Sequence, residues 1–388
     1  MTANHRLICT LCGEKADWTD WRCRACGGAL RIAWTGPAPA VRIAEHGRGL
    51  WRYRPLLPSI GWKEGVTLGE GGTPLVWIER WAAAHQLGRV GLKLESLNPT
   101  GSFKDRGAAV LASHARALGI ARLIEDSSGN AGASIAAYAA RAGLTAVIFV
   151  PASAPAAKRA QIARLGAEVV PIAGPRAAAA EAAATAAGRG AVYYAAHNWN
   201  PYFAAGMATF AYELIEELGE TGVDHLVIPT GGGSLFVGAY DGFVRWQDVT
   251  GTTVRLPRFQ AVQSVGCAPL VAAFQRGLDD VPPITRHPTV AGGIEIERPP
   301  RGRLILSVLR TTGGTAVAVE DAEIIAERER LAELEGIDLE PTAAAALAGL
   351  ARLARDGVVQ REETVIVAAT GAGWKDPGPL GSSPSRPE

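Results

Sequence analysis

The chain has 388 residues and is 48% hydrophobic, enough for two ordinary domains with their own cores. Its net charge is +1 with 20% charged residues, which excludes the strongly basic surface of a nucleic-acid or anionic-membrane binder. The chain opens without a signal-peptide pattern, and no apolar run is long enough to span a bilayer. We therefore expect a cytoplasmic protein without nucleic-acid or membrane partners.

Four of the five cysteines lie in one short stretch near the start of the chain. They form two Cys-x-x-Cys-Gly pairs, namely Cys9 with Cys12 and Cys23 with Cys26. Glycine after each pair allows the tight turn that a tetrahedral thiolate site requires, whereas two disulfides would suit an exported chain. We predict a closed structural zinc ribbon over residues 1–35, and a packed, unreactive Cys267.

After a linker at 35–40, short β-branched runs alternate with helical stretches. Strands with apolar residues at nearly every position are expected at 90–95, 121–127, 144–151, 167–172, 224–230, 258–265 and 363–370. Such strands are buried on both faces, which indicates parallel sheets in an α/β fold. The alanine-rich stretch 176–188 should be a helix packed closely on a sheet, and residues 378–388 a disordered tail.

The run ESLNPTGSFKDR (95–106) places Lys104 behind a Gly-Ser turn and ahead of a small-residue helix. The backbone partial charge at a helix N-terminus disfavours the ammonium form of a nearby lysine. A partly neutral amine is what Schiff-base chemistry needs. A solvated surface lysine is the alternative interpretation of this residue on its own.

Three further strand-to-helix loops carry polar or glycine-rich residues, where ligands bind in α/β folds. The first contains Ser127, Ser128 and Asn130, and Asn130 would either cap its helix or donate its amide to a ligand. The second is PTGGGS (229–234), which predicts an anion cradle, with a plain tight turn as the alternative. It lacks the Gly-Lys-Ser/Thr of a nucleotide triphosphate loop. In the third, Thr370 ends a strand and offers a neutral hydroxyl to a ring nitrogen.

Together these segments resemble the fold-type II pyridoxal-phosphate (PLP) enzymes, and within them the threonine synthases. The resemblance rests on NPTGSFKDRG (98–107), SSGN (127–130), PTGGGS (229–234) and ATGAGWKDP (369–377), and extends from about Leu68 to Pro377. It implies a tryptophan-synthase-β-like fold with two parallel-sheet α/β domains behind the zinc ribbon. We expect a first domain at 45–205 with the PLP lysine, and a second at 206–388 with the phosphate loop.

The resemblance also implies a role for each matching residue. Lys104 would bind PLP covalently and shuttle protons, and Asn130 would hydrogen-bond the ring hydroxyl. The cofactor phosphate would lie on a cradle made of Gly231, Gly232, Gly233 and Ser234. Thr370 would meet the pyridine nitrogen without protonating it. Ser127, Ser128 and Lys158 are the candidate substrate-binding residues, and a homodimer is expected by analogy with the family.

Several positions depart from the threonine-synthase pattern. Asn130 is followed by Ala131 and Gly132 instead of two hydroxyl residues, and NPYFAAGMAT (200–209) replaces an arginine, a glutamate and a lysine with apolar groups. Fewer charges would hold a substrate phosphate, at about 1.5–3 kcal/mol for each lost ionised contact. Lys158, Arg159 and Arg106 could compensate for this loss.

Three functions compete on this basis. The first is conversion of O-phospho-L-homoserine and water to L-threonine and phosphate. The second is β-elimination or β-replacement on a serine-type amino acid, which the lost charges favour. The third is a zinc-ribbon module that recognises nucleic acid or protein through Trp18, Trp21 and Trp34, although such residues more often form a core or a docking face.

Overall fold

The computed structural model describes residues 3–35, 49–62, 64–187, 192–219 and 222–376. The tail at 378–388 and all but the first residue of the linker lie outside these ranges. The chain folds into two compact units, each made from separate stretches of sequence. Unit 1 comprises 1–73, 98–220 and 233–254, and unit 2 comprises 74–97, 221–232 and 255–388.

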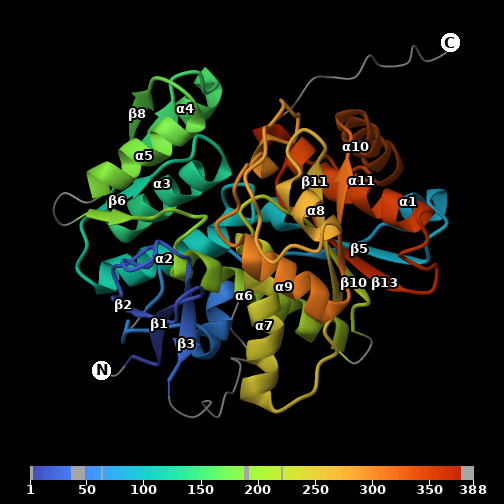
Figure 1. Ribbon diagram of the computed structural model, residues 1–388, viewed down its shortest axis with the longest axis horizontal. Coiled ribbons are helices and arrows are strands. Elements are labelled where there is room, and N and C mark those ends of the chain that lie inside the picture. The colour runs from blue at the N-terminus through green and yellow to red at the C-terminus, as the bar shows by residue number, and fades with distance from the viewer. Residues whose placement is uncertain (1–2, 36–48, 63, 188–191, 220–221, 377–388) are drawn as a thin grey trace. The chain divides into compact units, whose positions relative to one another are not determined.

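Unit 1 combines a small antiparallel sheet with a parallel one (Figure 1). The antiparallel sheet has the order β2-β1-β3, with β1 at His5–Cys9, β2 at Lys15–Ala16 and β3 at Leu30–Trp34. The parallel sheet has the order β8-β7-β6-β9, with β6 at Arg122–Glu125, β7 at Thr145–Pro151, β8 at Glu168–Ile172 and β9 at Val192–Tyr194. The sequence predicted β6, β7 and β8 but not the short β9.

The helices of unit 1 pack on its strands and on one another (Figure 1). They are α2 (Lys104–Ala117), α3 (Asn130–Ala142), α4 (Ala156–Arg164), α5 (Arg176–Ala187), α6 (Pro201–Leu218) and α7 (Ser234–Thr250), preceded by the 3₁₀ helix η1 (Leu50–Leu56). In the alanine-rich α5, Ala179 and Ala183 are fully buried and the helix contacts β7. The predicted close packing of this helix is confirmed.

Unit 2 is built on a six-stranded sheet of order β12-β11-β10-β13-β5-β4, parallel except for the edge strand β4. Its strands are β4 (Leu75–Trp77), β5 (Arg89–Lys93), β10 (His225–Pro229), β11 (Arg258–Ser264), β12 (Thr315–Val319) and β13 (Thr364–Ala368). Its helices are α1 (Glu79–Ala84), α8 (Pro269–Gln275), α9 (Gly302–Thr312), α10 (Asp321–Glu335) and α11 (Pro341–Arg355), with 3₁₀ turns at Glu95–Leu97, Gly292–Ile294 and Gly373–Lys375. The α/β fold with two parallel sheets is as predicted.

The units divide the chain differently from the expected continuous domains at 45–205 and 206–388. Residues 74–97 belong to unit 2 because β5 pairs with β13, in the middle of the chain's larger sheet. Residues 206–219 and 233–254 belong to unit 1 because α6 packs on α2 and α7 packs on α6. Strand pairing and helix packing join segments that are distant in sequence, which a linear division cannot represent.

Two glycines allow α2 and α6 to approach closely. A Cβ on Gly206 would lie 2.2 Å from the carbonyl oxygen of Arg106, and one on Gly107 would lie 2.7 Å from the Phe203 ring. This approach brings Arg106 to Glu213 of α6, where the two side chains form a bidentate ion pair at 2.6 and 2.8 Å. Arg106 is fully buried and also donates to Thr209. It is therefore committed to the interior of unit 1, and its suggested role in holding a substrate phosphate is wrong.

Replacing Arg106 with methionine should leave the Glu213 carboxylate buried in the core of unit 1 without its ion-pair partner. We expect the free energy of unfolding to fall by about 3–5 kcal/mol, because a buried charge that loses its partner keeps its desolvation cost. Urea unfolding measures this change. The Arg106→Met/Glu213→Leu double variant should recover most of the loss, while Arg310→Met, which breaks the exposed pair with Asp279, should change stability little. A full loss in the double variant would contradict the ion-pair explanation.

Candidate active site

Lys104 is the first residue of α2, as the sequence predicted, and its N-cap is Phe103. The neighbouring Asp105 anchors the backbone here, since its carboxylate accepts hydrogen bonds from the Thr100 amide at 2.7 Å and the Ser134 hydroxyl at 2.6 Å. The half-buried Lys104 side chain carries its Nζ 4.4 Å from the centre of the Phe103 ring. The amine is thus held at a helix N-terminus beside aromatic carbon, where its charge is poorly solvated.

The loop at 127–130 follows β6 and leads into α3 within unit 1. Asn130 is the first residue of α3 and Gly129 is the N-cap, so the capping interpretation of Asn130 is wrong. The buried Ser127 accepts a hydrogen bond from the Gly129 amide at 3.2 Å. Ser134 of α3 donates a hydrogen bond to Asp105 of α2. This bond connects the first turn of α2, which begins at Lys104, to the start of α3, which begins at Asn130.

The glycine at position 132 has a packing reason. A Cβ there would lie 1.9 Å from the Ser127 carbonyl oxygen. No residue with a side chain fits this close approach without moving the loop, so the absence of a hydroxyl at 132 follows from how the loop packs on α3.

The glycine loop connects β10 of unit 2 to α7 of unit 1. On the unit 2 side, a Cβ on Gly231 would lie 3.0 Å from the Ile294 Cα, so the backbone is tightly enclosed. On the unit 1 side, Gly233 is the N-cap of α7 with a φ of 86°, and Ser234 is the buried first helical residue. Gly232 between them is also buried. Amides at a helix N-terminus favour an anion, as the sequence predicted for this loop.

Thr370 follows β13, which pairs in parallel with β10, so within unit 2 Thr370 and Gly231 lie beyond the carboxyl ends of neighbouring strands. Its Oγ1 is buried and has no hydrogen-bond partner among the described residues. In unit 1 the same holds for Oγ of Ser102, two residues before Lys104. Buried hydroxyls without partners are costly. Taken one by one, the glycine-loop amides suit a phosphate, the Thr370 hydroxyl suits a ring nitrogen and the Lys104 amine suits an aldehyde.

The remaining substrate candidates lie on the same unit as Lys104. Ser128 is a half-buried residue of the 127–130 loop. Lys158 and Arg159 lie on α4 and are half-buried, and α4 packs on α3 and β8. Lys158, Arg159 and Arg106 are the three cations that could replace the charges missing from the threonine-synthase pattern. Lys158 and Arg159 lie near the solvent, whereas Arg106 is buried.

The four cysteines of the ribbon come together in unit 1, as predicted. All four Sγ atoms lie within 4.8 Å of one another. The Cys9–Cys26 and Cys12–Cys23 distances are 3.4 and 3.7 Å, too long for a disulfide and close to the ~3.8 Å expected between thiolates on one tetrahedral zinc. Gly13 and Gly27, which follow the two pairs, have φ values of 74° and 72°. The donor set therefore fits a four-coordinate metal.

The ribbon's tryptophans pack on the rest of unit 1. The Trp21 ring meets Tyr194 edge-on at 4.9 Å and Trp199 at 5.9 Å. The Trp34 ring lies 3.9 Å from the guanidinium of Arg245 on α7. This favours a docking face for Trp21 and Trp34 over a stacking surface, while Trp18 is 40% exposed.

Sequence reasoning missed a carboxylate–histidine cluster at the carboxyl edge of the unit 1 sheet. Glu125 is the last residue of β6 and is fully buried. Its Oε1 lies 2.6 Å from Nδ1 of His197, which follows β9. Asp126 is next to Glu125, and its Oδ1 accepts a hydrogen bond from Tyr194. The available signal was a glutamate ending an otherwise apolar strand, directly before the 127–130 loop.

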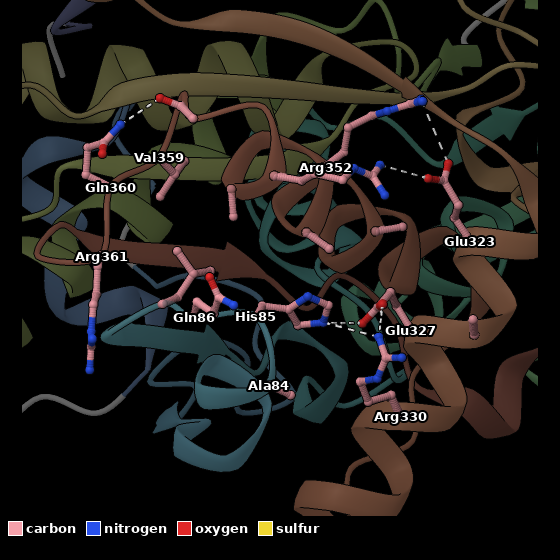
Figure 2. A pocket seen from close by; sticks show the side chains of 17 residues that line it. Ala84, His85, Gln86, Glu323, Glu327, Arg330, Arg352, Val359, Gln360 and Arg361 are labelled. Carbon is pink, nitrogen blue, oxygen red and sulfur yellow. Dashed lines mark hydrogen bonds and ion pairs between the residues drawn. The ribbon is translucent and has the colours of Figure 1, made fainter.

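A separate pocket of about 660 Å³ lies in unit 2 among α1, α10 and α11 (Figure 2). Figure 2 shows His85 and Arg330 pointing to Glu327, and Arg352 near Glu323. Arg330 and Arg352 thus each lie within ion-pair distance of a carboxylate. The pocket contains none of the predicted site residues and no glycine-rich loop, so it does not share the features of the cofactor site.

Comparisons with known proteins show the family of the chain. Residues 66–371 match the family described as "Pyridoxal-phosphate dependent enzyme". The threonine synthase of Methanosarcina acetivorans is 35% identical over 379 residues, covering 96% of this chain and 93% of that protein. The threonine synthase of Methanocaldococcus jannaschii is 33% identical, covering 95% and 92%.

Solved structures share the fold at lower identity. Threonine deaminase isoform 2 from Solanum lycopersicum has a TM-score of 0.67 at 22% identity, covering 77% of this chain and 79% of that one. A fungal L-serine ammonia-lyase from Rhizomucor miehei has the same TM-score and identity, covering 80% and 95%. Among the described residues, no helix is both long and apolar enough to cross a membrane.

Proposed function

The chain belongs to the pyridoxal-phosphate dependent enzyme family, and we propose that it converts O-phospho-L-homoserine and water to L-threonine and phosphate. This proposal rests on sequence identities of 35% and 33% to two threonine synthases over nearly the whole chain. It also rests on the lysine at the start of α2. When bound, PLP supplies an electron sink for the carbanions that this reaction requires.

We propose the following roles for the residues that would hold the cofactor. Lys104 would hold the cofactor through its amine at the aldehyde carbon, and Asn130 would donate to the ring hydroxyl. The amides of Gly231 to Gly233, with the Ser234 hydroxyl, hold the phosphate. The buried Thr370 hydroxyl pairs with the ring nitrogen, and because threonine is neutral it leaves that nitrogen without a proton.

The substrate roles follow from the same loops. Ser127 and Ser128 lie directly before Gly129, the N-cap of α3, where a substrate carboxylate would meet the N-terminus of that helix. Lys158 on α4 is proposed to contact the substrate phosphate. With the cofactor bound, the Lys104 amine would move protons among the α, β and γ carbons of the substrate.

We also propose that the four cysteines hold a structural zinc ion. Four thiolates fill a tetrahedral shell, so no position remains for a water or a substrate. The zinc would stabilise the ribbon, whose Trp21 and Trp34 dock on the rest of unit 1.

Replacing Lys104 with alanine should remove the visible absorption band of the bound cofactor and lower turnover at least about 10²–10⁴-fold, because no other amine takes its place at the start of α2. Absorbance spectra and phosphate release measure both effects. Lys15→Ala, at an exposed lysine of the ribbon, should behave like the unmodified protein. A normal band and normal turnover in Lys104→Ala would disprove the assignment of the PLP lysine.

Metal analysis should find about one zinc ion per chain, and Cys23→Ser should lose it. We expect the melting temperature to fall while turnover per cofactor-loaded molecule is unchanged, because the metal is structural. Cys267→Ala removes a buried thiol outside the cluster and should keep the zinc. Loss of catalysis without loss of stability in Cys23→Ser would argue against a structural metal.

A second function, β-elimination on serine or threonine, is favoured by one observation. Phe203 and Ala208 are buried and apolar where the threonine-synthase pattern has an arginine and a lysine, and Arg106 is paired with Glu213. Phosphate release from O-phosphohomoserine would establish the synthase. Ammonia and keto-acid release from serine or threonine, with O-phosphohomoserine inert, would establish the lyase instead.

A further inference from the structure

Glu125 and His197 form a rigid pair of buried titratable groups that the mechanism so far does not use. They follow the neighbouring parallel strands β6 and β9, so both lie at the carboxyl edge of the unit 1 sheet. Besides the 2.6 Å contact between Oε1 and Nδ1, the His197 backbone amide donates to Oε2 of Glu125 at 3.2 Å. Two bonds from one residue to both carboxylate oxygens fix the orientation of the imidazole.

This pair shares its surroundings with the Lys104 amine. The Phe203 ring centre is 5.9 Å from Nζ of Lys104 and 6.0 Å from the centre of the His197 ring. Burial raises the pKa of Glu125 to about 7, while the positive charge of Lys104 acts to lower it. Burial, and after it the charge of Lys104, holds the pKa of His197 well below its usual value. Since a Coulomb interaction is mutual, the charge of the pair acts equally on the amine.

The other ionisable groups around the pair do not replace Lys104 as its partner. They come from the loop after β6, the start of α5 and strand β9, and are Asp126, Arg176 and Tyr194. Asp126 acts on His197 with the opposite sign to Lys104, and its own carboxylate accepts the Tyr194 hydroxyl at 3.0 Å. The charge of Arg176 acts with the same sign as that of Lys104.

We propose that the Glu125–His197 pair is a second proton-holding group of the reaction site and that it works through Lys104. The inference rests on the proposed function, because the synthase reaction moves protons at three substrate carbons while one amine carries one proton at a time. With Glu125 ionised, its carboxylate accepts Nδ1–H and leaves Nε2 of His197 as the acceptor. A proton that leaves Nζ is taken up by the pair and later returns, so the exchange needs no other reactant. His197 and Glu125 are therefore positioning residues for the protonation of Lys104.

The chain contains a matched control for this pair. His225 is a buried histidine whose Nε2 lies 3.0 Å from Oε2 of Glu363. It begins β10 in unit 2, at the amino edge of its sheet, and Lys104 is absent from the groups that act on its pKa. Loss of this histidine–glutamate pair should affect stability in the same way as loss of the Glu125–His197 pair, without reaching the chemistry.

The first experiment measures the coupling in the cofactor-free protein. Carbon-13 labelling of glutamate carboxyls allows the Glu125 titration to be followed by NMR, with Glu125→Gln to assign its signal. Lys104→Met should raise the Glu125 midpoint by about one pH unit, because a positive charge that favours the carboxylate is removed. The Glu363 signal in the same sample should not move. An unchanged Glu125 midpoint would overturn the proposal.

The second experiment measures the consequence in the cofactor-loaded enzyme. Glu125→Gln keeps the shape but removes the negative charge, so the pH midpoint of the cofactor's absorption band should fall by about one unit. His197→Asn should lower kcat about 100-fold and shift the acid limb of kcat/KM, because Glu125 would lose its hydrogen-bond partner. His225→Asn should leave the absorption midpoint and the pH profile unchanged. An unaltered pH profile in His197→Asn would overturn the proposal.

These readouts separate this inference from the proposed substrate. The NMR and absorption midpoints need no substrate, so shifts without turnover of O-phosphohomoserine would reject the synthase assignment and keep the pair. Turnover of O-phosphohomoserine without either shift would keep the synthase assignment and reject the pair.

Discussion

The anchoring of the first turn of α2 is the constraint on which the rest of unit 1 depends. Lys104 is half-buried, but the two residues after it are fully buried and bound on different sides. Asp105 holds the Thr100 turn and Ser134 of α3, and Arg106 holds Glu213 of α6. Each buried charge is stable only with its partner, so the position of the lysine backbone is set by the cost of leaving either one unpaired.

Because this anchoring fixes the backbone of Lys104, it also helps to explain why charged groups can collect at the carboxyl edge of the unit 1 sheet. Parallel strands bring their carboxyl ends to one edge, where the loops are free of ladder hydrogen bonds and available for polar side chains. Glu125 and His197 meet there although 72 residues separate them. Their burial is tolerable because they bond each other and because the Lys104 amine supplies a positive charge nearby.

Much of the fold and site was predictable because the signals were local. The start of α2 at Lys104 followed from a turn before a run of small residues, and the cysteine cluster followed from spacing and from glycines that adopt positive φ. Most strands of both parallel sheets followed from their apolar runs, but β4 and β12 did not. The short β9 and the split of residues 74–97 from their neighbours did not, because strand pairing with distant segments produced them.

The sequence by itself determined the family, and it marked Lys104, the glycine loop and the four cysteines as candidate site residues, since each is written in a short run whose chemistry needs no partner elsewhere in the chain. Only the tertiary structure decided where the charged residues went. Arg106 stands two residues beyond the lysine, yet the close packing of α2 on α6 directs it to Glu213 in the interior of unit 1. Glu125 reads as the end of a strand, and only the pairing of β6 with β9 gives it His197 as a neighbour. The physical reason is that a buried charge is placed by its partner, and its partner is chosen by packing between distant segments.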